Sequence, residues 1–329
     1  MDAITGGGWP WGRMVLLYGP ESSGKTTLAC KACATIQNLE AGTRRPFDIY
    51  EDISAKERCR ALYVDQESVL DREWATSLGM DVDHHLIARP ESGEEAIDLI
   101  TATINEDIVD AIVLDSIAAC TPTKELEDES GTNHPGLQAR LMNQAFRKWQ
   151  PALTKLGDKA PVFFLINQTR EKIGVMYGDP TTIPGGQAQH FYSSIKLRLS
   201  RVKMEESSEK EMASALFSCT TVKNKTFTQK LETAFSVYVK DTIEDGVKWK
   251  KGEFQNCSDV YKMAKKYGLC GHTWNTGRLL GTGVEVGGTT IKKEEIISVS
   301  KDADMIQILH DKPELERILW NQVIKKIME

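Results

Sequence analysis

Short apolar runs alternate with amphipathic segments along the first two thirds of the chain. Six of these runs have the length and composition of buried strands. They span residues 14–19, 60–65, 85–90, 111–116, 162–167 and 194–200. Helical patterns lie between several of them, for example at residues 26–40 and 94–106. This alternation predicts an α/β fold with a mostly parallel central sheet flanked by helices.

Two stretches depart from that alternation. Residues 40–60 are polar and charged and contain a proline, which is typical of a surface insertion. From about residue 251 the chain has a helical pattern, then a stretch rich in glycine and threonine, and then a charged helical end. We therefore expect a core over residues 1–250, with the insertion at about 40–60, and a small C-terminal α/β domain over residues 251–329.

The composition is that of an ordinary soluble globular protein, with 40% hydrophobic and 27% charged residues. The sequence contains no apolar run of about 18 residues, so we expect no transmembrane helix and no membrane partner. The first residues lack the basic and apolar regions of a secretory signal, and the expected location is cytoplasmic.

The cysteines indicate neither disulfides nor a metal site. Seven cysteines at irregular spacing do not predict a disulfide framework in a chain of 329 residues. Cys30 and Cys33 form a C-x-x-C pair, but no second pair follows with the spacing of metal ligands. We interpret both as buried, reduced residues of the predicted helix.

The charge is unevenly distributed. The net charge of −6 argues against a generally basic nucleic-acid-binding protein, yet residues 147–201 hold nine Lys and Arg against three Asp and Glu. A local basic surface can bind phosphates even when the whole chain is acidic. A solvated surface explains the charge equally well.

The strongest chemical signal follows the first predicted strand. Residues 19–27 read GPESSGKTT and fit the pattern G-x-x-x-x-G-K-[ST] of a phosphate-binding loop between a strand and a helix. Backbone N–H groups and the positive helix end would bind the phosphates. Lys25 would neutralise the β- and γ-phosphates, and Thr26 would hold Mg²⁺. The expected nucleotide contacts are Gly19, Pro20, Glu21, Ser22, Ser23, Gly24, Lys25, Thr26 and Thr27.

Two acidic residues at the ends of other predicted strands would complete this site. Asp115 ends the run at 111–116 and can share Mg²⁺ with Thr26. Helix capping is the alternative explanation of an Asp at a strand end. Glu67 follows the run at 60–65, and a carboxylate there is suited to orient an attacking water molecule.

Five segments together resemble the RecA family of bacterial DNA recombinases. They read GPESSGKTTL (19–28), DQE (65–67), VLDSIAACTP (113–122), INQTREKIGVMYGDPTTIPGG (166–186) and VKNK (222–225). Their order and approximate spacing match from about residue 7 to residue 225. The fourth segment is similar to the second DNA-binding loop of that family and is not a general feature of ATPases.

The resemblance implies a RecA-type P-loop ATPase core that uses ATP and Mg²⁺. Gln168, next to Asn167, would sense the γ-phosphate, since a neutral amide can bind phosphate or water without adding charge. Lys223 and Lys225 would reach the ATP of a neighbouring subunit, so hydrolysis would depend on assembly.

The resemblance also implies contacts with adenine and with DNA. Trp74 would stack on the adenine, with core packing as the alternative, and Asp71 could accept from the adenine amino group. Two loops, at about 127–136 and 170–186, would face the DNA. The implied DNA contacts are Arg140, Arg147, Arg170, Ile173, Gly185 and Gly186.

The chain departs from the family pattern in four ways. It begins just before the first core strand and ends in VIKKIME, so we expect neither the N-terminal docking segment nor the acidic C-terminal tail of the family. The insertion at 40–60 is not part of the pattern. At a second, weaker DNA site, Ser200 and Ser218 replace basic residues, for which Arg198, Arg201 and Lys203 could compensate.

With this resemblance, the sequence predicts an ATP-dependent recombinase that binds single-stranded DNA and forms a nucleoprotein filament. The filament would pair that strand with homologous double-stranded DNA and exchange strands, with specificity coming from base pairing. Two alternatives remain open at this point. One is a RecA-like hexameric helicase, disfavoured by the segment at 166–186. The other is a non-catalytic accessory DNA-binding protein, which the departures above keep open.

Overall fold

The computed structural model describes most of the chain. The described residues are 1–37, 60–128, 136–171, 181–206, 212–244, 247–271, 273–275, 284–286, 289–291 and 296–328. The insertion expected at about 40–60 lies outside these residues, except for Arg60.

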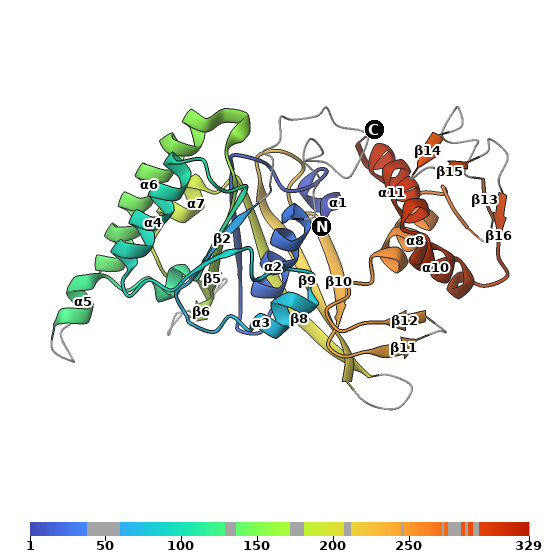
Figure 1. The fold of residues 1–329 in the computed structure, drawn as a ribbon, viewed down its shortest axis with the longest axis horizontal. Helices are drawn as coiled ribbons and strands as arrows, with labels where there is room; N and C mark the ends of the chain where they lie inside the picture. Colours follow the sequence, from blue (N-terminus) through green and yellow to red (C-terminus); the bar gives the residue numbers. More distant parts are fainter. Residues whose placement is uncertain are drawn as a thin grey trace.

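Eight strands form one sheet through the centre of the molecule (Figure 1). They are β1 (Met14–Gly19), β2 (Ala61–Asp65), β3 (Leu86–Ala88), β4 (Ala111–Asp115), β5 (Val162–Gln168), β8 (Ile195–Glu206), β9 (Met212–Asn224) and β10 (Glu232–Tyr238). Their spatial order is β10-β9-β8-β1-β5-β4-β2-β3. The strands from β8 to β3 are parallel, and β9 and β10 extend the sheet antiparallel. The predicted α/β fold with a mostly parallel sheet is confirmed.

Helices cover both faces of the sheet, which explains the continuous apolar runs of the parallel strands. Helices α2 (Lys25–Gln37) and α3 (Arg72–Ser77) pack on one face. Helices α4 (Gly93–Asn105), α6 (Leu137–Leu156) and α7 (Ala188–Tyr192) pack on the other (Figure 1). Neighbouring residues of a strand point to opposite faces, so Val15 belongs to the first core and Leu16 to the second.

The parallel register brings the ends of several strands to one edge of the sheet. Gly19 at the end of β1 pairs with Gln168 at the end of β5. Asp65 at the end of β2 pairs with Asp115 at the end of β4. The segments that follow these four strands therefore start side by side, and in open α/β sheets this edge is where ligands bind.

The antiparallel strands β9 and β10 were not predicted. Their sequences, such as SALFSCTTV, mix polar and apolar residues because only one face packs on the core. The predicted run at 194–200 continues to Glu206, with a register shift between Arg201 and Lys203 that marks a β-bulge.

The C-terminal residues gather around a third cluster of buried side chains, which includes Tyr238, Trp249, Trp274 and Leu319. Its helices are α8 (Asn256–Lys266), α10 (Asp302–Asp311) and α11 (Pro313–Met328). Three small antiparallel pairs lie nearby: β11 (Thr242–Glu244) with β12 (Val247–Trp249), β13 (Thr273–Asn275) with β16 (Ile296–Ser298), and β14 (Val284–Val286) with β15 (Thr289–Ile291). A domain boundary at residue 250 stays a prediction.

The remaining short elements are α1 (Asp2–Thr5), η1 (Ile117–Ala119), α5 (Thr123–Glu127), η2 (Gly157–Lys159), β6 (Arg170–Glu171) and β7 (Thr181–Thr182). Of the helices in the described ranges, none has the length and hydropathy that crossing a bilayer requires.

The C-x-x-C pair lies inside α2, as the sequence predicted. Cys30 and Cys33 are both fully buried and both carry free thiols. Burial raises the pKa of Cys33 to about 12 and that of Cys30 well above its usual range. Both thiols are therefore protonated at neutral pH and poorly reactive, because the thiolate is the nucleophile.

We expect the folded double variant Cys30→Ala/Cys33→Ala to contain the same number of fast-reacting thiols at pH 8 as the unsubstituted protein. The reason is that neither thiol ionises in the folded state at that pH. Titration with a chromogenic disulfide measures this, and the same titration in denaturant should show two thiols fewer in the variant. Fewer fast-reacting thiols in the folded variant would contradict the burial of the pair.

Candidate functional site

The phosphate-binding loop pattern lies between β1 and α2, and close packing explains both of its glycines. A Cβ at Gly19 would lie 2.1 Å from the backbone oxygen of Leu199 in β8. Gly24 has φ +83°, and a Cβ there would lie 2.9 Å from the ring of Phe217 in β9. The loop is thus pressed against two strands that are remote in the sequence, and neither glycine can be replaced without a clash.

Lys25 begins α2 with its ammonium group folded under the loop. Its Nζ donates to the backbone oxygens of Gly19 at 3.2 Å and Pro20 at 2.6 Å. Burial lowers the pKa of Lys25, while the negative charges of Asp115 and Glu67 act in the opposite direction. The cation lies where it would neutralise an anion bound by the loop.

Asp115 is the buried carboxylate next to this cation. Its Oδ2 accepts from the hydroxyl of Thr26 at 2.8 Å and from that of Tyr63 at 2.6 Å. Burial raises the pKa of Asp115 to about 6, and these two hydrogen bonds oppose the shift. A carboxylate and a hydroxyl oxygen in contact form the donor set that Mg²⁺ prefers, so the predicted metal ligands Thr26 and Asp115 fit that ion.

Glu67 receives two hydrogen bonds on one oxygen. Ser116 Oγ donates to its Oε1 at 2.5 Å, and Gln168 Nε2 donates to the same atom at 2.9 Å. Within the described residues, Oε2 takes part in no hydrogen bond. Glu67 and Gln168, predicted separately from segments far apart in the sequence, are thus in direct contact.

The turn that carries Glu67 is held by a second buried carboxylate. Asp65 accepts from the backbone N–H groups of Val69 and Leu70, each at 3.2 Å, and from Nε of Arg89 at 3.1 Å. These contacts close the turn after β2 and fix the direction in which Glu67 points.

A cavity of about 290 Å³ lies beside the loop. Its lining combines loop residues with side chains of β8, β9 and the end of β10. The lining residues are Ser22, Ser23, Gly24, Lys25, Thr26, Thr27, Arg201, Met204, Ala215, Phe217 and Val239. The last five were not predicted as part of this site, and no local motif marks them, because only the pairing of the antiparallel strands brings them here. Arg201 was instead expected near DNA.

The predicted adenine contacts lie close to the loop. Trp74 Nε1 donates to Thr27 Oγ1 at 3.2 Å, and its ring packs against the core shared with α2. Asp71 caps α3 by accepting from the backbone N–H of Trp74 at 3.1 Å. The first contact ties α3 to the phosphate loop, and the adenine roles of both residues stay predictions.

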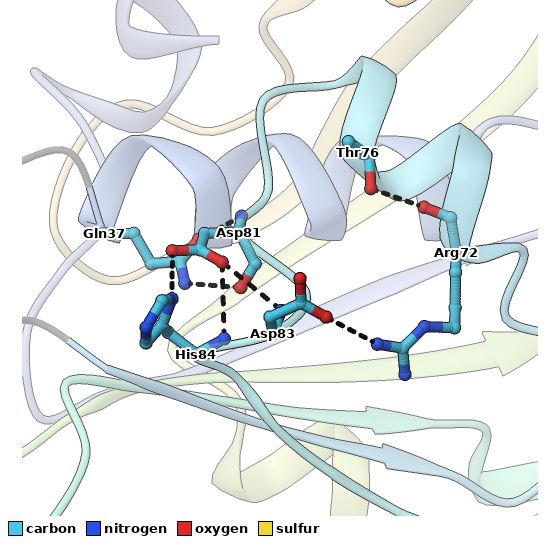
Figure 2. Close-up of polar contacts among 6 residues, drawn as sticks. All are labelled: Gln37, Arg72, Thr76, Asp81, Asp83 and His84. Atoms are coloured by element: carbon cyan, nitrogen blue, oxygen red, sulfur yellow. Dashed lines mark hydrogen bonds and ion pairs between the residues drawn. The ribbon is translucent and has the colours of Figure 1, made fainter.

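A polar cluster fixes the position of α3 relative to the end of α2 (Figure 2). Gln37 donates to the backbone oxygen of Asp81 at 3.1 Å and accepts from its N–H at 2.9 Å. Arg72 Nη2 lies 3.1 Å from Asp83, and His84 Nδ1 lies 2.6 Å from Asp81. The exposed Arg72–Asp83 ion pair contributes little by itself, but together these contacts hold the helix that carries Trp74.

Asn167, just before the predicted second DNA loop, holds the returning end of that loop. Its buried side chain donates to the backbone oxygen of Pro184 at 2.9 Å and to Gln189 at 2.8 Å. The segment that leaves β5 at Arg170 thus returns to the end of the same strand. Arg170 is exposed, and Ile173 lies outside the described residues.

The remaining predicted DNA contacts lie on α6 and on the turn before α7. Arg140 and Arg147 are exposed and seven residues apart, so they share one face of α6. Gly185 and Gly186 have positive φ and pack closely. A Cβ on Gly185 would lie 2.5 Å from Ile117, and one on Gly186 would lie 2.9 Å from Ala139. Packing alone therefore requires both glycines, and their DNA contacts stay predictions.

Lys223 does not simply extend into solvent from the end of β9. Its Nζ donates to the backbone oxygens of His190 at 2.6 Å and Phe191 at 3.1 Å, near the end of α7. Burial, Lys225 and Lys196 lower its pKa. Lys225 is exposed. The two predicted trans-acting cations thus belong to a compact basic group that includes Lys196.

The sheet and the loop define an α/β protein in which a loop with the phosphate-binding sequence pattern lies at the carboxyl edge of the parallel strands. The family model of the RecA N-terminal domain matches residues 1–244, and the chain belongs to the RecA family.

Individual relatives agree with this assignment. The chain is 43% identical over 202 residues to Protein RecA of Staphylococcus aureus strains JH9 and Newman, which covers 61% of this chain and 52% of the relatives. It therefore spans about half the length of these curated relatives. The crystal structure of the RadB recombinase has a TM-score of 0.50 and 19% identity, over 72% of this chain and 92% of that chain. That likeness shows the fold.

We expect Gly185→Ala to lower the free energy of unfolding by about 3 kcal/mol, from backbone strain plus an overpacked contact with Ile117. Gly136→Ala is the matched control, because Gly136 also has positive φ, at +77°, but a Cβ there would meet nothing within 4 Å. The control should cost only about 1 kcal/mol. Urea unfolding measures both, and equal losses would contradict the packing role of Gly185.

Proposed function

We propose that this chain is an ATP-dependent recombinase, which binds single-stranded DNA as a filament and pairs it with homologous duplex DNA. Membership of the RecA family and the fold support the proposal. The observation that carries it is the contact between Glu67 and Gln168, since it joins the hydrolytic carboxylate to the strand that leads into the DNA loop.

ATP would bind with its phosphates on the backbone of residues 19–27 and its transferable phosphoryl group towards Lys25. Thr26 and Asp115 would hold Mg²⁺, which supplies neutralisation of the charge that develops on the phosphate oxygens. Tyr63 keeps the carboxylate of Asp115 oriented. Glu67 would orient the attacking water through its open oxygen, while Ser116 and Gln168 hold the other oxygen in place.

DNA would be bound by the surface that begins at Arg170. Arg140, Arg147 and Arg170 are exposed and suited to phosphate oxygens, so they would position the strand without reading its sequence. Ile173 would contact bases from the same loop, and Gly185 and Gly186 would allow the backbone close to the strand. Recognition of homology is then left to base pairing.

Filament assembly would place Lys223 and Lys225 at the ATP of the neighbouring subunit. A positive charge there lowers the barrier to phosphoryl transfer only once two subunits meet. Lys223 is anchored on α7, which would let it keep a defined direction before assembly. No feature of the described residues favours the helicase or the accessory alternative over this function.

Glu67→Gln should reduce ATP hydrolysis by about 10²-fold, because the amide cannot activate water as the carboxylate does. The affinity for ATP should stay within about twofold, since Glu67 lies outside the phosphate loop. Steady-state hydrolysis and nucleotide titration measure the two quantities, with exposed Glu73→Gln on α3 as the control. A collapse of ATP affinity would assign Glu67 a structural role instead.

Mixing two inactive variants tests assembly and hydrolysis together. Lys25→Ala removes the cation of the phosphate loop, and Lys223→Ala removes the cation given to the neighbour, so each variant alone should be inactive. Mixed interfaces can join an intact loop to an intact Lys223, and part of the DNA-dependent hydrolysis should return. Activity that stays absent at every ratio, while the unsubstituted protein is insensitive to its own concentration, would refute hydrolysis between subunits.

A further inference from the structure

Arg201 is a cation that the fold places at the nucleotide cavity. It follows Leu197 and Leu199 on β8, which point into the core beneath α2. Alternation along the strand puts Arg201 on that same face, and it pairs in register with Phe217, another residue of that core. Arg198, between the two leucines, points to the opposite face.

The β-bulge after Arg201 determines what the side chain reaches. Arg201 pairs with Phe217 and Lys203 with Leu216, so Val202 has no partner across the strand and is 55% exposed. A bulge of this kind re-aims the side chains next to it. Arg201 consequently lines the cavity beside the phosphate loop, together with Met204 from the far side of the bulge.

The residues that line the cavity indicate which part of a nucleotide it could hold. Residues 22–27 form one wall, and Met204, Phe217 and Val239 supply apolar surface. The carboxylates of Asp115 and Glu67 are not part of the lining. The cavity thus runs from Lys25 and Thr26, at the reacting end, to apolar side chains of the antiparallel strands, and it leaves the two carboxylates outside. It is suited to the phosphate chain of a nucleotide, with the α-phosphate on the side away from the carboxylates.

The side chain of Arg201 makes no hydrogen bond or ion pair with the other residues that the structure describes. We propose that its guanidinium binds the α-phosphate of the nucleotide held by its own subunit, rather than DNA. Planar N–H donors match phosphate oxygens. The inference rests on the proposed function, since it assumes that the loop binds ATP.

Arg201→Ala should weaken both ADP and ATP binding by about tenfold, the loss expected for one charge-assisted contact. In steady-state hydrolysis, the substitution should raise KM and leave kcat nearly unchanged. Arg201→Lys should recover part of the affinity, because it keeps the charge but loses the planar donors. Arg13→Ala is the matched control, an exposed arginine that precedes β1 at the opposite edge of the sheet. Calorimetric titration with ADP and with a non-hydrolysable ATP analogue measures the affinities.

Unchanged nucleotide affinity in Arg201→Ala would overturn the inference. Duplex DNA binding could then weaken, with the slope of log K against log salt concentration smaller in magnitude by about one. In that case Arg201 would belong to a second DNA site instead. An equal loss in Arg13→Ala would mean a general effect of net charge and would also overturn it. Failure of the unsubstituted protein to bind nucleotide would refute the proposed function itself, which separates the two outcomes.

Discussion

The hydrogen bond from Gln168 to Glu67 is the contact on which the arrangement of the site depends. Gln168 is the last residue of β5, and Glu67 follows β2. These two strands are not neighbours in the sheet, because β4 lies between them. Ser116, directly after β4, donates to the same carboxylate oxygen. Residues at the ends of three parallel strands therefore meet at the carboxylate of Glu67. This convergence is possible because parallel strands present all their carboxyl ends at a single edge, and both hydrogen bonds to Glu67 go to Oε1.

The same strand end also carries the proposed link to DNA. Asn167, next to Gln168, holds the returning end of the predicted DNA loop through Pro184 and Gln189. A rearrangement of that loop on DNA would displace Asn167 and with it the neighbouring Gln168. The hydrogen bond from Gln168 would pass this displacement to Glu67. Allosteric coupling requires an element whose position both sites influence, and we propose the end of β5 as that element.

The sequence alone predicted the parallel strands, the phosphate loop, the placement of Asp115 and Glu67 and the burial of the C-x-x-C pair, because each has a local pattern. It did not predict β9 and β10, whose half-buried faces give weak periodicity. Nor did it predict the partners of the two carboxylates, Tyr63 and Ser116, or the cavity wall that includes Arg201. These depend on strand pairing between residues far apart in the chain. Gly185 was predicted to contact DNA, whereas its close packing against Ile117 is visible only in the structure.

The measurement that tests the account most directly is the stimulation of ATP hydrolysis by single-stranded DNA in Gln168→Ala. If Gln168 transmits the state of the DNA loop to Glu67, the variant should still bind ATP but lose most of the stimulation, by about tenfold or more. Gln187→Ala, an exposed glutamine on the turn before α7, should keep it. The same fold-stimulation in Gln168→Ala as in the unsubstituted protein would contradict the account.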